Sequence, residues 1–379
     1  MHATSPAQPA TRTRDPWFDN AKMALVTLVV VGHALTLLPT TAFNNHLYDF
    51  LYAWHVPAFV LVTGYLSRSF SWERRRMWQL VRTVVVPYVV FECAIALFRI
   101  HVGGEQLQDL FKDPHWPMWY LAALFFWRLV TPVFKAIPGA LPVALAISLV
   151  AGLYAGDTLD LARVLGLLPF FVMGLSATPE RLERLRAPAV RITGVVVLAA
   201  IWVLTTWTDR WAATEWLYYR ARYDEFDVSD PRAFAIRAGV LLVGTLGAWA
   251  FLAVVPRVGG WFTRMGAWTL VVYLFHGFAV KGASYAGYPD WAADHGTFAL
   301  LVTVAASVAL SFLLAWGPLA SRLNHLVDPL GYAERRVKEA HATVNAKAET
   351  DVISAAVEDA ATLRAMPEPV DATSDRASR

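Results

Sequence analysis

Four ionisable side chains lie inside otherwise apolar stretches of this sequence, and they are the first candidates for chemistry. His33, His55, Glu92 and His276 each lie 10 to 13 residues from a Lys or Arg at one end of their stretch. With about 1.5 Å of rise per helical residue, all four lie about 15–20 Å from one boundary. Ionisable groups are costly in hydrocarbon, so those that occur there often serve function. If their helices are neighbours, the four groups form a buried polar centre.

A centre of this kind is compatible with three roles. A neutral imidazole can take the proton of a hydroxyl group that attacks an acyl carbon. The same side chains can instead form a proton or substrate relay in a transporter or flippase. Each histidine can also serve only the fold, by donating to a backbone carbonyl, and Glu92 beside Cys93 can be a buried protonated acid. These residues by themselves leave the three roles open.

The composition indicates the elements that must position these groups. Of 379 residues, 56% are hydrophobic and 17% are charged, with 16 Trp and 21 Phe. This predicts an all-α, polytopic integral membrane protein with about ten transmembrane helices, at about 20 residues per crossing. The candidate spans are 23–38, 47–66, 81–100, 119–137, 141–155, 164–177, 192–208, 233–255, 267–280 and 298–319. The first can also be a signal peptide, although we favour a retained helix, and the short fifth and sixth can form a re-entrant hairpin.

The distribution of Lys and Arg predicts the orientation. With the N-terminus inside, the inner segments hold 19 of these residues and the outer segments at most nine. We therefore expect a multi-pass protein of the plasma membrane with both termini cytosolic. The inner run Glu73-Arg74-Arg75-Arg76, followed by Arg82, is either an orienting anchor or a site for the phosphates of an anionic donor. The outer segment 209–232 is rich in Trp and Tyr, which suits either sugar binding or an aromatic belt at the interface.

Three regions and several exclusions follow from the same composition. We predict a flexible cytosolic N-terminus over 1–19, a membrane domain over 20–330 and a polar cytosolic tail over 331–379. A net charge of +3, dispersed between apolar stretches, argues against a nucleic-acid partner. With one Cys and no repeated Cys/His spacing, we predict no metal site. The sequence has no Walker glycine loop, HExxH or GxSxG, which disfavours ATP hydrolysis, zinc peptidase chemistry and a hydrolase nucleophile elbow.

Six short motifs follow one another between residues 15 and 330. They are Phe18-Asp19-Asn20-Ala21-Lys22 with His33 after ten further residues; Trp54-His55-Val56-Pro57-Ala58-Phe59 with Thr63-Gly64-Tyr65; Arg82 with Pro87-Tyr88; Pro117-Met118-Trp119-Tyr120-Leu121; Pro169-Phe170-Phe171-Val172-Met173-Gly174-Leu175; and Gly266-Ala267-Trp268-Thr269 with Tyr273-Leu274-Phe275-His276. In this order they resemble the acyltransferase 3 family of membrane proteins, which includes sugar and polysaccharide O-acetyltransferases and macrolide O-acyltransferases. Two positions depart from the family pattern. Arg76 and Arg82 are six apart, with Gln79 between them, where the family often has Arg-x-x-Arg, and Thr63 replaces a serine.

The resemblance implies an enzyme that moves an acyl group, most simply acetyl, from acyl-CoA to a hydroxyl of a sugar-containing acceptor such as a cell-surface glycan, glycolipid or glycoside. It implies that His33 is the general base, or else carries the acyl group briefly, with Asp19 and Lys22 at the inner mouth. The remaining roles fall to residues that bind the donor or the acceptor. Arg82 and Arg76 would meet the donor's phosphates, with Arg128 as the next candidate; His55, His276 and Tyr273 would bind or polarise the acyl carbonyl; Trp119, Tyr120 and Glu92 would contact the acceptor. The rival hypothesis remains a transporter or flippase that uses the same histidines and Glu92.

Overall fold

The computed structural model describes residues 15–107, 113–156 and 158–365, and throughout these residues the regular structure is helical, with no β-strand. The chain divides into two units, Met1–Asp328 and Pro329–Arg379. The first half of the first unit contains α1 (Pro16–Leu35), α2 (Ala42–Tyr52), α3 (His55–Leu66), α4 (Arg74–Leu80), the π-helical segment η1 (Val81–Val85), α5 (Val86–His101), α6 (Trp119–Ala136), α7 (Ala140–Tyr154), η2 (Thr158–Asp160), α8 (Leu161–Gly166) and α9 (Leu168–Ser176). Its second half contains α10 (Pro179–Arg184), α11 (Pro188–Thr205), α12 (Thr208–Trp211), η3 (Thr214–Tyr218), η4 (Tyr223–Glu225), α13 (Asp230–Val254), α14 (Trp261–Met265), α15 (Thr269–Tyr285), α16 (Tyr288–Leu314) and α17 (Gly317–Val327).

Several of these helices are long and apolar enough to cross a membrane. Among the described residues there are five: α1, the continuous helix Arg74–His101, α11, α13 and α16. A sixth arises if Thr158–Gly166 and Leu168–Ser176, which meet at 53°, form one bent span or a re-entrant loop. The other predicted spans are helical but shorter or less apolar. The predicted span 47–66, for example, is divided at Trp54 between α2 and α3. The structure therefore shows a helical protein with five or six helices, among the described residues, that are long and apolar enough to cross a membrane.

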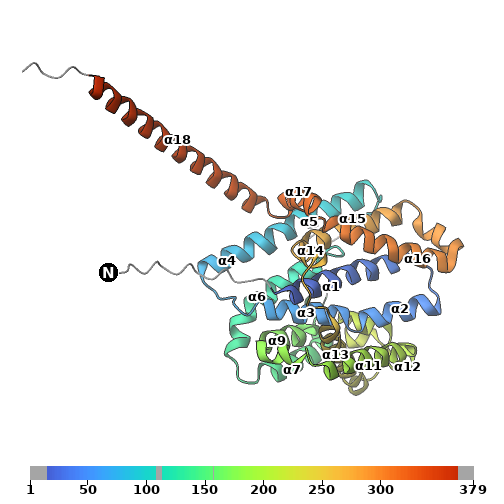
Figure 1. Cartoon of the computed structure of the whole chain (residues 1–379). Coiled ribbons are helices and arrows are strands. Elements are labelled where there is room, and N and C mark those ends of the chain that lie inside the picture. Colours follow the sequence, from blue (N-terminus) through green and yellow to red (C-terminus); the bar gives the residue numbers. More distant parts are fainter. Residues whose placement is uncertain (1–14, 108–112, 157, 366–379) are drawn as a thin grey trace, which may run out of the picture. The chain divides into compact units, whose positions relative to one another are not determined.

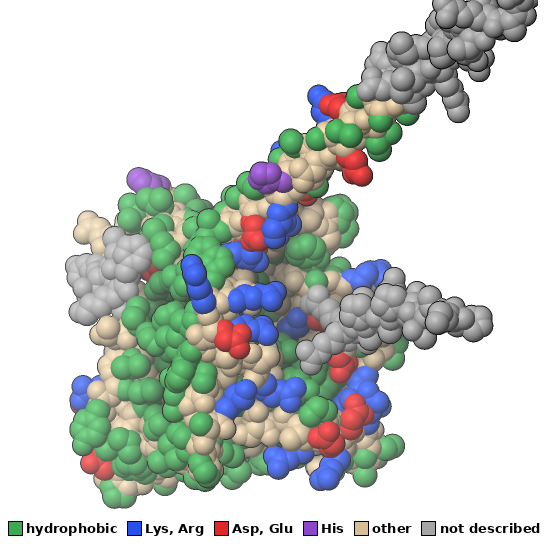
Figure 2. Space-filling view, turned by 90° about the vertical axis from the view of Figure 1, so that its left-hand side faces the viewer, with side chains coloured by type: hydrophobic (Ala, Val, Ile, Leu, Met, Phe, Trp, Pro, Cys, Tyr) green, Lys and Arg blue, Asp and Glu red, His purple; other side chains and the backbone are tan. Residues whose placement is uncertain are grey.

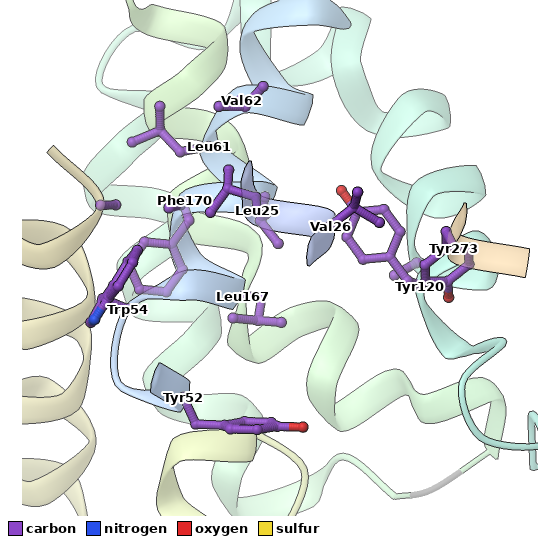
Figure 3. Packing of buried hydrophobic residues seen from close by; sticks show 14 of the residues in the cluster. Leu25, Val26, Tyr52, Trp54, Leu61, Val62, Tyr120, Leu167, Phe170 and Tyr273 are labelled. Atoms are coloured by element: carbon purple, nitrogen blue, oxygen red, sulfur yellow. The ribbon is translucent and has the colours of Figure 1, made fainter. Parts of the chain in front are cut away.

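Helix α3 lies at the centre of the first unit and packs against α1, α9 and α13 (Figure 1). Two glycines allow the closest of these contacts. A Cβ atom at Gly64 would lie 2.1 Å from the carbonyl oxygen of Phe171, and one at Gly174 would lie 2.0 Å from that of Leu61. Such distances are impossible for a real side chain, so the backbones of α3 and α9 touch only because both positions lack one. Around this contact Leu61, Val62 and Phe170 belong to the buried core (Figure 3).

Hydrogen bonds join several basic connections at one end of the first unit. Lys135 donates to the carbonyl oxygen of Arg68 at 2.8 Å, and Arg68 donates to that of Ala177 at 2.9 Å. Arg257 donates to the carbonyl oxygen of Leu182 at 3.0 Å. Figure 2 faces this end and shows many Lys and Arg side chains with fewer Asp and Glu. We call it the basic end; the positive-inside rule predicts that it is cytosolic.

The opposite end carries the aromatic connection 206–229. Trp216, Tyr219 and Tyr223 are buried, with ring centroids 5.8, 5.2 and 5.7 Å from the guanidinium carbon of Arg237 on α13. These three rings therefore surround a buried cation instead of forming an interfacial belt or an open sugar platform. Tyr218, in contrast, hydrogen-bonds Tyr48 at 3.0 Å and faces a cavity described below.

The second unit contains one long helix, α18 (Pro329–Ala365). Its described side chains are almost entirely exposed from Ala333 to Val357, which agrees with the polar composition of the predicted tail. The division between the units lies at Asp328, two residues before the predicted boundary at 330. Residues 1–14 and 366–379, parts of the predicted N-terminus and tail, lie outside the described residues.

Candidate active site

Two of the histidines predicted to share one depth, His33 on α1 and His276 on α15, are in direct contact. Nδ1 of His33 lies 2.8 Å from Nε2 of His276, and both rings are buried. Nδ1 of His276 lies 2.6 Å from the carbonyl oxygen of Tyr273. Because a carbonyl only accepts, His276 carries its proton on Nδ1, and its Nε2 accepts the Nδ1–H of His33. Nε2 of His33 keeps its lone pair, which is what a general base requires.

The third histidine, His55, begins α3 and lines the same cavity as His33. Its Nδ1 donates to the carbonyl oxygen of Leu51 at 2.6 Å, so its Nε2 also keeps a lone pair. Gly32 on α1 leaves room for the rings of Tyr52 and His55. A Cβ atom at this position would lie 3.1 Å from the ring of Tyr52 and 3.9 Å from that of His55. The structure thus places His33 and His55 on the wall of one cavity, with His276 buried behind His33 and not among the described lining residues.

Glu92, the fourth of these groups, lies behind the site and is not among the described residues that line its cavities. It is fully buried, and its Oε1 accepts the backbone N–H of His115 at 2.8 Å and also bonds Nδ1 of that residue. His115 precedes Trp116, whose ring centroid lies 4.3 Å from that of His33. Contact with the acceptor was predicted for Glu92; its observed contacts instead hold the segment that places Trp116 on His33.

A cavity of about 280 Å³ extends from His33 toward the end opposite the basic end. We call it the outer cavity. Aromatic rings dominate its wall, and it contains two arginines. The lining residues are Val29, His33, Tyr48, Tyr52, His55, Val56, Phe59, Trp116, Trp119, Tyr120, Arg163, Leu217, Tyr218, Arg220 and Tyr273. Apolar faces together with hydroxyl and guanidinium groups suit a polar ligand that has flat hydrophobic surfaces, such as a sugar.

A second cavity, of about 250 Å³, lies toward the basic end, and we call it the inner cavity. Its polar lining includes Lys22, Thr83, Arg128 and Thr269. It shares Leu66, Thr83 and Arg128 with a third cavity of about 220 Å³. That third cavity is lined by Arg76, Gln79 and Arg82, among others. Four basic side chains therefore line the two cavities on this side.

Three aromatic residues separate the outer and inner cavities. Phe59, Tyr120 and Tyr273 line both of them, and we call these residues the partition. The hydroxyl of Tyr120 is hydrogen-bonded to that of Thr63, and the hydroxyl of Tyr273 donates to the carbonyl oxygen of Pro117. The two tyrosine rings lie near each other, with centroids 5.8 Å apart (Figure 3). The two cavities thus meet at one wall, beside a histidine with a free lone pair. Two substrates, one in each cavity, could react at this wall.

Comparison with known proteins decides the family. Residues 15–316 match the model of the acyltransferase 3 family, described as an acyltransferase domain, which covers most of the chain. The chain belongs to the acyltransferase 3 family. A relative in this comparison is nodulation protein NolL of Mesorhizobium japonicum, 26% identical over 182 residues, which are 43% of this chain and 48% of NolL. The chain thus spans about half the length of that relative. No solved structure matches the chain.

The first and last acyltransferase 3 motifs meet at the start of α1. Lys22 forms an ion pair of 2.8 Å with Asp19 and lines the inner cavity, whereas Asp19 is buried. A Cβ atom at Gly266 would lie 2.3 Å from the backbone oxygen of Asp19, so the glycine of the last motif allows α14 to pack on α1. Asp19 therefore orients Lys22, which lines the inner cavity, while Asp19 itself is not among the described residues of the cavity wall.

The arginine motif of the family lies at the third cavity. Arg76 and Arg82 both line it, and so does Gln79, the residue that departs from the family spacing. Nε of Arg82 lies 3.3 Å from Oδ1 of Asp328, and Arg82 belongs to the π-helical segment η1. The extra residue in a π-helical turn rotates the following side chains, so the six-residue separation of Arg76 and Arg82 is compatible with a common cavity.

Trp116, Arg163 and Arg220 are among the outer-cavity residues that sequence analysis did not single out. Trp116 adjoins the Pro117–Leu121 motif, which was the available signal for it. Arg163 and Arg220 entered only the count of outer charges. Among the predicted acceptor residues, Trp119 lines the outer cavity and Tyr120 belongs to the partition.

Proposed function

We propose that this acyltransferase 3 protein moves an acyl group from acyl-CoA to a hydroxyl of a sugar-containing acceptor, and that the two substrates enter from opposite ends. The supporting observation is the pair of cavities whose described linings have only the partition in common, namely Phe59, Tyr120 and Tyr273. In the plasma membrane, with the basic end cytosolic, the donor would arrive from the cytosol. The acceptor would enter the aromatic outer cavity from the other face. Acetyl-CoA is the simplest donor that this arrangement would use.

The residues on the donor side fit acyl-CoA, which carries several phosphates. Lys22, Arg76, Arg82 and Arg128 line the inner and third cavities. Guanidinium groups bind phosphate oxygens through paired, charge-assisted hydrogen bonds. The phosphates would bind in the third cavity, and the acyl end of the donor would reach the partition through the more apolar inner cavity.

The proposed chemistry follows from the tautomers of the two histidines. Nε2 of His33 takes the proton of the acceptor hydroxyl while its oxygen attacks the acyl carbon. The carbon–sulfur bond then breaks, and the sulfur leaves as a thiolate that takes up a proton to give free CoA. Protonated His33 is stabilised because its Nδ1–H already donates to His276. To polarise the acyl carbonyl, the Tyr273 hydroxyl would have to leave the carbonyl oxygen of Pro117, or Nε2 of His55 would have to be protonated, because the one N–H of neutral His55 donates to Leu51.

The test is acyl transfer by His33→Gln, measured with purified protein in lipid and labelled acetyl-CoA. Glutamine can hydrogen-bond but is a poor base, so we expect normal folding and about 10²–10⁴-fold slower transfer. His295→Gln is the matched control, since His295 is an exposed histidine on α16 outside both cavities. Near-normal transfer by well-folded His33→Gln would eliminate His33 as the base. Solute movement that needs no acyl-CoA would favour a transporter instead.

A further inference from the structure

The outer cavity contains two arginines for which transfer to a neutral sugar gives no role. Arg163 extends from α8, and Arg220 belongs to the connection 206–229 at the opposite end. A general base and a polarised carbonyl suffice for attack by a sugar hydroxyl. A guanidinium is costly to bury, yet the side chain of Arg163 is only 14% exposed. Because Arg163 also lines the cavity, its charge can serve a ligand there as well as its protein partners.

The contacts of Arg163 hold its guanidinium in one orientation. Nε donates to the carbonyl oxygen of Tyr218 at 3.1 Å, and Nη1 donates to Oδ2 of Asp160 at 3.2 Å. The group also lies over Trp119, with its carbon 4.5 Å from the ring centroid. Within the described part of the chain, Nη2 has no hydrogen-bond partner. A fixed guanidinium with open N–H groups in a cavity is suited to a carboxylate or phosphate.

Arg163 and Arg220, which are both basic, are the Asp, Glu, Lys or Arg side chains among the described residues that line the outer cavity. Arg220 forms ion pairs with Asp113 at 3.2 Å and with Asp160 at 3.4 Å. Neither of these aspartates lines the cavity, and none of its described lining residues is acidic. Asp49 is turned toward Thr214, with which it hydrogen-bonds at 2.7 Å. Both arginines are thus ion-paired, but the described wall that a ligand would meet contains the arginines and not these carboxylates.

The aromatic part of the same wall indicates the rest of the ligand. Trp116 lies on His33, and Trp119 lies under Arg163. Indole faces pack against the C–H faces of sugar rings, while the base faces a hydroxyl. We propose that the acceptor is an anionic sugar compound, with a carboxylate or phosphate near the acylated hydroxyl, and that Arg163 binds this anion with Arg220 at the mouth of the cavity. This inference rests on the proposed acyl transfer.

Equilibrium binding to the purified protein in lipid discs tests the inference. The probes are methyl β-D-glucuronide, glucose 1-phosphate and the neutral methyl β-D-glucoside. We expect at least one anionic probe to bind about tenfold or more tightly than the glucoside, and the preference to weaken as salt is raised. Comparing the affinity for the glucuronide with that for glucose 1-phosphate identifies whether the site prefers a carboxylate or a phosphate.

Variants test whether Arg163 causes the preference for anionic probes over the neutral glucoside. Arg163→Gln should reduce the anionic preference to about twofold or less, whereas Arg163→Lys, which keeps the charge without the fork, should retain part of it. Arg210→Gln is the matched control. Arg210 is an exposed arginine of the connection 206–229, which also carries Arg220, and it does not line the cavity. It should leave the preference unchanged. If Arg163→Gln does not fold, Arg163→Lys and the salt dependence carry the test.

Two results would overturn the inference: anionic probes that bind no better than the glucoside, including no binding of either, or a preference that persists in Arg163→Gln. Acetyl transfer from labelled acetyl-CoA is followed separately. Transfer to neutral and anionic sugars at equal rates would refute the anion site while leaving the proposed function intact. An anionic preference without any consumption of acetyl-CoA would refute the proposed function while leaving the anion site intact.

Discussion

Glu92 contacts His115 through two hydrogen bonds and so acts on the site from behind. In Glu92→Ala both donors of His115 would be left buried without a partner, at a cost of about 1–3 kcal/mol in the free energy of unfolding. We also expect a lower kcat with an unchanged KM for acyl-CoA, because Trp116 would shift on His33 while the inner cavity is unaffected. Thermal unfolding and steady-state acyl transfer measure the two effects.

Glu92→Gln is the control for this residue, because its amide oxygen can still accept the His115 N–H. It should restore most of the stability and rate. A raised KM for the acceptor with normal kcat and stability in Glu92→Ala would contradict this and favour direct contact with the acceptor.

Arg82 lines the third cavity, where we propose that the phosphates of the donor bind. Loss of a charge-assisted bond of about 1.5–3 kcal/mol should raise the KM for acyl-CoA about tenfold or more in Arg82→Ala. Arg74→Ala, at an exposed arginine outside the third cavity, should leave KM unchanged. Asp328→Asn removes the observed ion pair but keeps Arg82. An equal rise of KM in Asp328→Asn and Arg82→Ala would mean that the ion pair, and not phosphate binding, determines the effect.

Contact between two elements, α3 and α9, depends on Gly64 and Gly174. In Gly64→Ala the new methyl group would overlap a backbone carbonyl that belongs to a packed helix, so the helices must separate. Because α3 carries His55, Phe59 of the partition and Thr63, which is hydrogen-bonded to Tyr120, we expect loss of both folded yield and activity. Yield in membranes and thermal stability are the measurements.

Gly239→Ala on α13 is the matched control for this contact, since a Cβ atom there meets nothing within 4 Å. Helix propensity should make that variant neutral or more stable, by up to about 1 kcal/mol. Normal stability of Gly64→Ala would show that α3 and α9 are less closely packed than the structure indicates.

The first unit presents two chemically different ends, and their orientation can be measured. In a Cys93→Ala background, Glu225→Cys tests the opposite end and Arg184→Cys tests the basic end, both at exposed positions. The positive-inside rule predicts that a membrane-impermeant maleimide labels only Glu225→Cys in intact cells. Arg184→Cys should react after permeabilisation. Labelling of both from the same side would contradict the separate entry of donor and acceptor.

Much of this protein could be predicted from local properties of its sequence. Apolar composition indicated a helical membrane protein, and the helical rise placed His33, His55, Glu92 and His276 at one depth. The motif order indicated the family, which the match over residues 15–316 confirmed. The number of crossings could not be predicted in this way. Apolar stretches do not show where a helix breaks, as α2 and α3 do at Trp54.

Which of these groups come into contact depends on the tertiary structure. Depth is set along each helix axis by the rise per residue, and therefore follows from sequence. Lateral neighbours and helix rotation depend instead on packing between elements, such as the approach of α3 to α9 at Gly64. That packing brings His33 to His276, turns Glu92 away to His115, and places Arg163, predicted only as an outer charge, beside the aromatic wall. Spacing along one chain contains no information on such rotations, because they result from the summed contacts of helices that are distant in sequence.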